Sequence, residues 1–203
     1  NVGVDASKYK DVDDLINKGI ITIPGAKAKI AELLNPSTTP LILVEKTDEE
    51  THVDDNTTNV NEVVGDCVMY FRKRIPRNVT LDYNGLASQP VQAMLNRALF
   101  EWVIENLMKN SLDALQGHGI IDVVIGEDDR TVFVEVSDTG KGIAKSNWTR
   151  IFEPGFTTKT RGWGLGLSLA KRIIEEYHKG KIFVKSSVVG QGTTFRVALK
   201  KKL

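Results

Sequence analysis

Apolar side chains return every three or four positions in three stretches of the chain, and this spacing predicts amphipathic helices. The predicted helices cover residues 60–75, 90–116 and 167–178. Asn59 stands where it can cap the first helix, Pro76 ends that helix, and Gly117 ends the second. Each helix has one apolar face, which has to pack against another layer of the fold.

A period of two characterises several stretches outside these helices and predicts strands. Val132, Val134 and Val136 alternate with other residues in 131–137, which is expected to pair with 121–125 around an acidic turn. The remaining predicted strands are 79–83, 181–187 and 193–199, the last two joined through Gly190 and Gly192. Helices on one side and antiparallel hairpins on the other predict an α+β fold. We expect a two-layer sandwich whose mixed, mostly antiparallel sheet packs on three helices.

The first quarter of the chain has a weaker pattern. Residues 47–58 contain one apolar and five acidic residues, which indicates a solvated acidic linker. Before it, short helices near 12–16 and 30–34 and a strand at 41–46 are expected. Residues 1–46 are too few for an independent core and stay unassigned. The sequence therefore predicts one catalytic or binding domain over 59–203.

The composition is that of a globular protein, with 41% hydrophobic and 26% charged residues among 203. A single cysteine, Cys67, excludes an internal disulfide and a cysteine-rich metal site. No apolar run approaches the roughly 18 residues of a membrane span, so no membrane contact is expected. The net charge of +1 divides into −5 over residues 1–58 and +6 over 59–203. Residues 72–77 form a short basic cluster without a motif that reads nucleic-acid bases, so no nucleic-acid partner is expected.

A polar stripe lies within the second predicted helix. Asn106, Lys109, Asn110 and Asp113 fall at offsets of 3, 4 and 7, which places them on one side. A solvated face would explain such a stripe. Two asparagines one turn apart are less usual, because asparagine disfavours helices. Their amide oxygens suit Mg²⁺, a hard ion that prefers oxygen ligands.

The segment 138–143 places a carboxylate at the end of a strand, where Asp138 is followed by Gly140 and Gly142. Such an aspartate can accept a hydrogen bond from an exocyclic amine, for example N6 of adenine. The glycines then allow the backbone to approach the ligand. Asp-x-Gly is also common in plain turns, so this motif alone leaves both interpretations open.

Three alternating glycines, Gly162, Gly164 and Gly166, stand directly before the third predicted helix, where unpaired amides favour phosphate. The string matches neither a Walker loop nor a Rossmann fingerprint. Upstream, residues 152–159 have little periodicity and contain Phe152 and Phe156. This stretch is either a lid over a nucleotide, anchored by one phenylalanine, or a surface loop with packed aromatics.

In this order, the four motifs resemble the ATP-binding catalytic domain of bacterial sensor histidine kinases, in the GHKL or Bergerat-fold superfamily. The resemblance covers residues 59–203. Its N box matches 101–115, its first glycine box 138–143, its F box 152–156 and its second glycine box 162–167. Each motif is unspecific by itself, whereas the combination is specific.

The resemblance implies ATP and Mg²⁺ as cofactors and gives individual residues a role. It implies Asn110 as the Mg²⁺ ligand, Asn106, Lys109 and Asn110 as the catalytic set, and Asp138 as the adenine contact. Phosphate contacts are implied for the lid and for the amides of residues 164–167. The implied nucleotide-binding residues are Asn106, Asn110, Asp113, Asp138, Gly140, Gly142, Ile143, Phe152, Thr157, Thr158, Lys159, Gly162, Gly164, Leu165, Gly166 and Leu167.

The reaction depends on one position of the N box. The gyrase, MutL and chaperone ATPases of this superfamily carry a glutamate four residues before the Mg²⁺ asparagine, where this chain has Asn106, which cannot act as a base. Glu105 is one residue off, a rotation of about 100° on a helix. We therefore expect a kinase that donates the γ-phosphoryl group to a histidine. The alternatives are a GHKL ATPase and a non-catalytic module that docks a protein when nucleotide orders its lid.

Histidine kinases carry an acceptor histidine followed by an acidic residue on a dimerising helical hairpin. None of the three histidines here, His52, His118 and His178, precedes an acidic residue. The expected partners are therefore a histidine-bearing dimerisation domain and, through it, a response regulator. The expected location is the cytoplasm, including the cytoplasmic part of a membrane-bound sensor.

Overall fold

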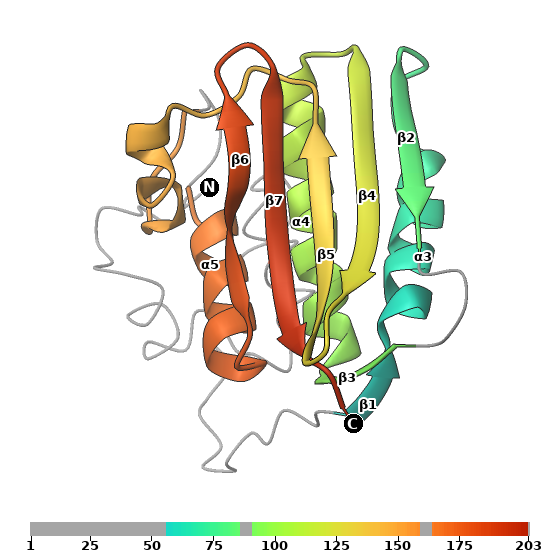
Figure 1. Ribbon diagram of the computed structural model, residues 1–203. Coiled ribbons are helices and arrows are strands. Elements are labelled where there is room, and N and C mark those ends of the chain that lie inside the picture. Colours follow the sequence, from blue (N-terminus) through green and yellow to red (C-terminus); the bar gives the residue numbers. More distant parts are fainter. Residues whose placement is uncertain (1–55, 86–90, 159–163, 203) are drawn as a thin grey trace, which may run out of the picture.

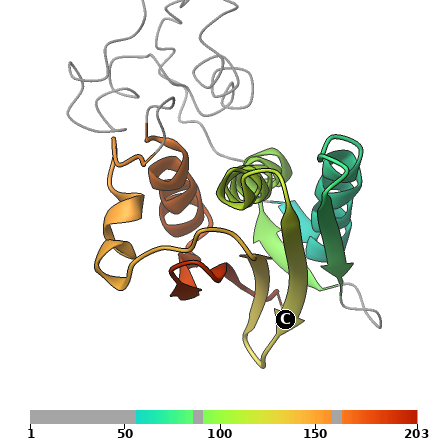
Figure 2. The same cartoon turned by 90° about the horizontal axis from the view of Figure 1, so that it is seen from above.

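The fold is a sheet covered on one face by helices, as seen in a computed structural model that describes residues 56–85, 91–158 and 164–202. Three helices lie side by side on one face of a five-stranded sheet (Figures 1 and 2). The helices are α3 (Val60–Arg72), α4 (Arg97–Leu115) and α5 (Gly166–Arg172), with short 3-10 turns η2 (Lys145–Asn147) and η3 (Arg150–Phe152) before α5. The predicted two-layer α+β sandwich is confirmed.

The sheet combines one parallel pair with three antiparallel pairs. Its strands, in spatial order, are β2 (Val79–Asn84), β4 (Gly119–Glu127), β5 (Thr131–Asp138), β7 (Gly192–Lys200) and β6 (Lys181–Val188). β2 runs parallel to β4, and all other neighbours are antiparallel. Both predicted hairpins are confirmed. In β5 every second side chain is buried, as the alternating valines predict.

Helix α4 forms the centre of the core. Phe100, Ile104, Leu107 and Met108 are fully buried and belong to one hydrophobic cluster with the inward-facing residues of the sheet. Burying a side chain of this size contributes roughly 1.5–3 kcal/mol. The packing therefore fixes the orientation of α4, and with it the direction in which its polar residues point.

The start of the second predicted helix is wrong. Residues 92–95 form the strand β3 (Gln92–Leu95), and the helix begins after Asn96, whose side chain accepts a hydrogen bond from the amide of Leu99 at 3.0 Å. Val91, Ala93 and Leu95 are buried while Met94 is exposed, which is the alternation of a strand. The spacing of Leu95 and Leu99 also fits a helix, so the local pattern did not separate the two structures.

The end of the predicted linker also has structure. Residues 56–58 belong to the strand β1 (Asn56–Asn59), which pairs antiparallel with β3. Asn59 caps α3 as predicted, since its side chain accepts a hydrogen bond from the amide of Asn61 at 3.1 Å. The expected elements in residues 1–46, and the linker up to residue 55, lie outside the described residues.

The third predicted helix changes its hydrogen-bond pattern before it ends. α5 continues into the π-helical turn η4 (Ile173–Tyr177), which His178 follows. The buried imidazole of His178 accepts a hydrogen bond at Nε2 from the amide of Asn96 (3.0 Å) and lies 2.9 Å through Nδ1 from the carbonyl oxygen of Ile173. This ring therefore joins the end of the α5 region to the beginning of α4.

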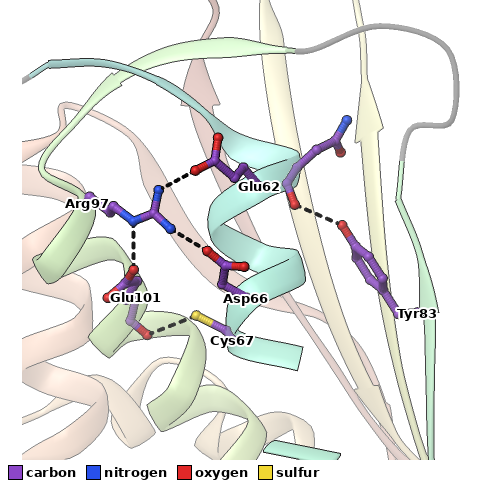
Figure 3. A network of polar contacts seen from close by, with 7 residues as sticks. Glu62, Asp66, Cys67, Tyr83, Arg97 and Glu101 are labelled. Atoms are coloured by element: carbon purple, nitrogen blue, oxygen red, sulfur yellow. Dashed lines mark hydrogen bonds and ion pairs between the residues drawn. The ribbon is translucent and has the colours of Figure 1, made fainter. Parts of the chain in front are cut away.

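A polar cluster joins α3 to the first turn of α4 (Figure 3). The guanidinium of Arg97 contacts Glu62 at 2.8 Å, Asp66 at 2.5 Å and Glu101 at 2.9 Å. Hydrogen bonds to Glu62 and Glu101 raise the pKa of Arg97 above its usual value. The cluster is solvent-accessible and orients the two helices at the end of α4 that is remote from Asn106 and Asn110.

Candidate functional site

The polar stripe of α4 is confirmed as one face of the helix, but its members differ in burial. Lys109 and Asp113 are exposed, Asn110 is half-buried, and Asn106 is buried with 8% of its surface exposed. The Nδ2 group of Asn106 has no hydrogen-bond partner among the described residues. An unpaired buried donor costs about 1–3 kcal/mol. A plain solvated face does not explain this residue, whereas a ligand oxygen would satisfy it.

The beginning of α5 lies against Asn106. A Cβ atom on Gly166 would come within 2.7 Å of the Asn106 Oδ1 atom, so a larger residue here would displace the Asn106 amide. The fold thus brings the second glycine motif next to the N-box motif, although the two are 60 residues apart in sequence. Leu165 and Leu167 pack against the hydrophobic core on either side of this contact.

Asp138 is the last residue of β5, a strand that points upward in Figure 1, and 7% of its surface is exposed. Its Oδ1 atom accepts a hydrogen bond from the amide of Gly140 at 2.8 Å. Burial raises the pKa of Asp138 above its ordinary value of 3.8, and the amides of Gly140 and Thr193 offset part of this rise. A buried carboxylate with spare acceptor capacity suits a neutral donor such as an exocyclic amine.

Two residues near Asp138 were missed by the sequence analysis. Ser111 follows Asn110 on α4 and is fully buried; it lies near the carboxylate, but its hydroxyl makes no hydrogen bond of good geometry among the described residues. Thr193 is buried opposite Asp138 in the β5–β7 pairing. The sequence contains a motif that points to Thr193. Gly190, Gly192 and Thr193 form a third glycine motif, which the sequence analysis assigns only to a hairpin turn.

The base loop (residues 139–143) is wedged between α4 and the β6–β7 hairpin. The amide of Lys141 donates to the carbonyl of Ala114 at 3.1 Å, and the carbonyl of Lys141 accepts from the amide of Gly190 at 2.8 Å. A Cβ atom on Gly140 would lie 2.6 Å from the Ala114 backbone, and one on Gly142 would lie 2.1 Å from the carbonyl oxygen of Val188. The two glycines serve close packing, which a plain strand-ending turn would not need.

The lid segment (residues 152–158) has one buried anchor. Phe152 is 8% exposed and meets Phe195 edge to face, with ring centroids 6.4 Å apart and an interplanar angle of 89°. Phe156 is half-buried beneath the guanidinium of Arg150, 5.4 Å from the ring centroid. Of the two proposed anchors, Phe152 is the one in the core. Its side chain therefore lies in the core packing, and its contact with a nucleotide stays a prediction.

The rest of the lid segment is exposed and faces the base loop. Thr157 and Thr158 are exposed, and the Thr158 hydroxyl accepts a hydrogen bond from Lys141 Nζ at 3.2 Å. The amide of Gly155 donates to the carbonyl of Gly164 at 3.1 Å, which joins the segment to the start of α5. The predicted contacts Lys159 and Gly162 lie outside the described residues.

Three further observations concern the described residues. Within the described ranges, no three His, Cys, Asp or Glu side chains gather into a metal-binding group. None of the described helices is both long and apolar enough to cross a membrane. His178 is buried with both ring nitrogens in contact with backbone atoms, so it cannot present a nitrogen to a nucleotide.

Comparison with known proteins identifies the family of this chain. The sequence profile described as "Histidine kinase-, DNA gyrase B-, and HSP90-like ATPase" matches residues 96–203. This chain is 42% identical to Sporulation kinase A of Bacillus subtilis (strain 168) over 100 residues. The matched region is 49% of this chain and 16% of the length of that kinase.

Solved structures give the same result for the fold. The catalytic domain of histidine kinase ThkA in a nucleotide-free form has a TM-score of 0.65 at 29% identity, covering 72% of this chain and 95% of that domain. Histidine kinase ThkA in complex with response regulator protein TrrA has a TM-score of 0.63 at 26% identity, covering 73% of this chain and 42% of that one.

Proposed function

Since this chain belongs to the histidine kinase-, DNA gyrase B- and HSP90-like ATPases and carries the ATP-binding catalytic domain of sensor histidine kinases, we propose that it transfers the γ-phosphoryl group of ATP to a histidine on a dimerisation domain. The observation that carries this proposal is the buried, unpartnered Asn106 amide beside the glycine-rich start of α5. These groups suit phosphate oxygens, while the buried Asp138 suits the base.

At the base end, Asp138 accepts a hydrogen bond from the exocyclic amine of adenine. The hydroxyl of Ser111 and the backbone amide of Thr193 supply further polar groups close to that carboxylate. The base loop forms one wall, with Gly140, Gly142 and Ile143 bringing their backbone close to the ring. Because these groups are held before the nucleotide arrives, little conformational entropy is lost when the base binds.

At the phosphate end, Asn106 donates its Nδ2 hydrogen to a phosphate oxygen, and the amides of residues 164–167 do the same from the start of α5. Asn110 is half-buried one turn further along the same face and is the residue that would hold Mg²⁺. A site with one amide ligand fits this ion, which keeps several waters and binds mainly through substrate phosphates. A Mg²⁺ ion held there would supply positive charge beside the phosphates. Lys109 and Lys159 supply further positive charge.

The transfer step is a direct displacement at the γ-phosphorus. The lone pair of a neutral imidazole nitrogen on the dimerisation domain forms the new N–P bond, and the bond from phosphorus to the bridging oxygen breaks. That oxygen leaves with the electron pair as ADP, and the proton of the phosphorylated imidazole ring passes to solvent. The acceptor comes from outside the described residues, because His178 is buried and His118 is followed by glycine in the turn after α4.

The proposal also concerns what receives the phosphoryl group afterwards and where. ThkA has been crystallised with a response regulator protein, which supports an aspartate-bearing response regulator as the next acceptor for this kinase. Transfer takes place in the cytoplasm, where ATP is available. Water is a poor alternative acceptor, because the Asn106 amide cannot remove its proton.

Replacement of Asn110 tests the proposal. We expect Asn110→Ala to lower transfer of labelled phosphate from ATP to an added histidine-bearing dimerisation domain by about tenfold to a hundredfold. Unfolding free energy should fall by about 1 kcal/mol or less, since Asn110 is only half-buried. The control is Arg130→Ala, which also removes a polar side chain but from the exposed β4–β5 turn.

The product distinguishes the alternatives. Acid-labile, base-stable label on the dimerisation domain supports the kinase. Steady release of inorganic phosphate that Asn110→Ala abolishes would identify an ATPase. Magnesium-dependent ATP binding with neither product would identify a docking module. Equal ATP affinity with and without Mg²⁺ would contradict the role of Asn110.

A further inference from the structure

Ser187 lies at the end of β6, two strands away from Asp138, and its hydroxyl contacts the base loop. The amide of Ile143 donates a hydrogen bond to Ser187 Oγ at 2.7 Å. The same oxygen donates to the carbonyl of Gly192 at 2.9 Å and lies 2.9 Å from the hydroxyl of Thr193. A serine hydroxyl has one donor and two acceptor sites. Ser187 therefore uses all three when Thr193 donates to it.

The other backbone group of Ile143 is also held by a side chain. The indole Nε1 of Trp148 donates to the carbonyl of Ile143 at 3.1 Å. Trp148 follows η2 and precedes η3, which ends at the core residue Phe152. Phe152 packs on Phe195 of β7, the strand that carries Thr193. The contacts thus close a ring from β6 through the base loop to the lid segment and back to the sheet.

We infer that Ser187 is a positioning residue for adenine recognition, acting with Trp148 as a two-sided clamp on the Ile143 backbone. Neither residue has to touch the nucleotide. Ser187 fixes the amide of Ile143 and Trp148 fixes its carbonyl, so the two peptide groups that flank Ile143 cannot rotate. Gly142 has a φ of +68°, and glycine by itself would leave this part of the loop conformationally free.

The rest of the contact explains why a side chain is needed at Ser187. The tip of the β6–β7 hairpin touches the base loop through backbone atoms, with Gly190 donating to the carbonyl of Lys141 at 2.8 Å. That bond holds the loop one residue before Gly142, and Ser187 holds it one residue after. The two bonds therefore bracket Gly142 and fix the wall that faces the base.

The inference rests on the proposed binding of ATP, and a matched pair of neighbouring serines tests it. Ser187→Ala removes the hydroxyl, whereas Ser186→Ala removes an exposed hydroxyl for which no side-chain hydrogen bond is described. Calorimetry measures the affinity for ATP and for purine riboside triphosphate, which lacks the exocyclic amine. We expect Ser187→Ala to weaken ATP roughly tenfold and the analogue about twofold or less. Ser186→Ala should weaken neither.

A second readout does not use nucleotide. Hydrogen exchange of the Ile143 amide should accelerate in Ser187→Ala and stay unchanged in Ser186→Ala, because the amide loses its acceptor. Ser187→Thr, which keeps the hydroxyl, should restore both the slow exchange and the preference for ATP. Trp148→Phe keeps an aromatic side chain but removes the indole donor together with some packing volume, so it should lower the ATP preference in the same direction.

The outcomes separate the inference from the function on which it depends. Failure of the wild-type chain to bind ATP would overturn the proposed function, whereas tight wild-type binding with an unchanged ATP preference in Ser187→Ala would overturn only the role of Ser187. Equal weakening of both nucleotides together with a lower melting temperature would show a general structural role instead. If Ser187→Ala does not fold, an unchanged ATP preference in Trp148→Phe overturns the clamp.

Discussion

The base end and the phosphate end of the candidate site are built differently. At the base end, Lys141 is bonded to α4 through its amide and to the β6–β7 hairpin through its carbonyl, and Ile143 is bonded to Ser187. At the phosphate end, the Asn106 amide has no hydrogen-bond partner among the described residues, and Thr157 and Thr158 are exposed. The backbone of the base loop is held by the fold in the free protein, whereas the phosphate end has a buried Asn106 amide that a ligand would complete.

This difference assigns separate tasks to the two ends. A preorganised base end gives selectivity at a low entropic cost, because its loop is already ordered. An incompletely bonded phosphate end gains hydrogen bonds only when an anion arrives, so its energy is available for binding the triphosphate. Changes that disturb the packing of the base loop should therefore damage the fold and the recognition of adenine together. Changes at the phosphate end should separate stability from function.

The largest expected effect comes from Gly142→Ala. Its Cβ atom would lie 2.1 Å from the carbonyl oxygen of Val188 on a backbone with φ +68°, so the loop has to move. We expect a loss of about 3 kcal/mol or more in unfolding free energy, measured by urea denaturation, and no detectable ATP binding.

The matched control is Gly155→Ala in the lid segment. Gly155 has a φ of +82°, but nothing lies within 4 Å of the added methyl group. Backbone strain alone should cost about 1 kcal/mol. Equal losses in the two variants would contradict the view that close packing, rather than φ, makes the base end rigid.

A smaller effect, opposite in sign for stability and binding, is expected for Asp138→Asn. Because burial raises the pKa of this carboxyl in the folded protein, the ionised form destabilises the fold at pH values above that pKa. The asparagine variant should be more stable than wild type at pH 7. The difference in stability should vanish below pH 3.8, the ordinary pKa of an aspartate, because Asp138 is then protonated in the folded and the unfolded protein alike. ATP affinity should fall roughly tenfold to a hundredfold.

The measurement is urea denaturation of both proteins between pH 7 and pH 3.5, read as a difference so that other carboxylates cancel. Calorimetry with ATP supplies the second half. An asparagine variant that is less stable than wild type at pH 7 would show that the charge of Asp138 is satisfied within the fold, and would remove it as a group reserved for the base.

The smallest effect is expected at the phosphate end, for Asn106→Leu. Leucine has a similar volume and removes the unpartnered Nδ2 group. Replacing an unsatisfied buried polar group by an apolar one should raise the unfolding free energy of the nucleotide-free chain by about 1 kcal/mol. ATP affinity and phosphoryl transfer should both fall.

Thermal unfolding with and without ATP tests this variant. Wild type should be stabilised by the nucleotide and Asn106→Leu should not, so the order of the two melting temperatures should reverse when ATP is added. A variant that is both less stable and fully able to bind ATP would contradict the difference between the two ends.

Much of the fold followed from local pattern. The alternation of Val132, Val134 and Val136 predicted β5 and its hairpin, and Asn59 predicted the start of α3, because pleat periodicity and capping depend on neighbouring residues. The start of α4 did not follow, because residues 91–95 fit both a strand and a helix. Whether these residues form a strand or a helix depends on pairing with β1, which lies more than 30 residues earlier and has no apolar pattern of its own.

The sequence predicted which chemical groups form the site but not how they are arranged in space. The order of four motifs identified the family and its ATP-binding role, since each motif needs particular residue types at a fixed spacing. It could not show that Phe152 is a core residue, or that Ser111 and Thr193 lie beside Asp138. Those facts depend on which faces of α4, η3 and β7 turn inward.

The sequence by itself therefore determined which chemical groups this protein has and in what order, because spacing along a helix or strand fixes the side on which a residue lies. The tertiary structure alone decided which of those groups meet. It placed Gly166 against Asn106 and Ser187 against Ile143. Contacts between residues 44 or 60 positions apart arise from the packing of whole elements, and no local pattern carries that information.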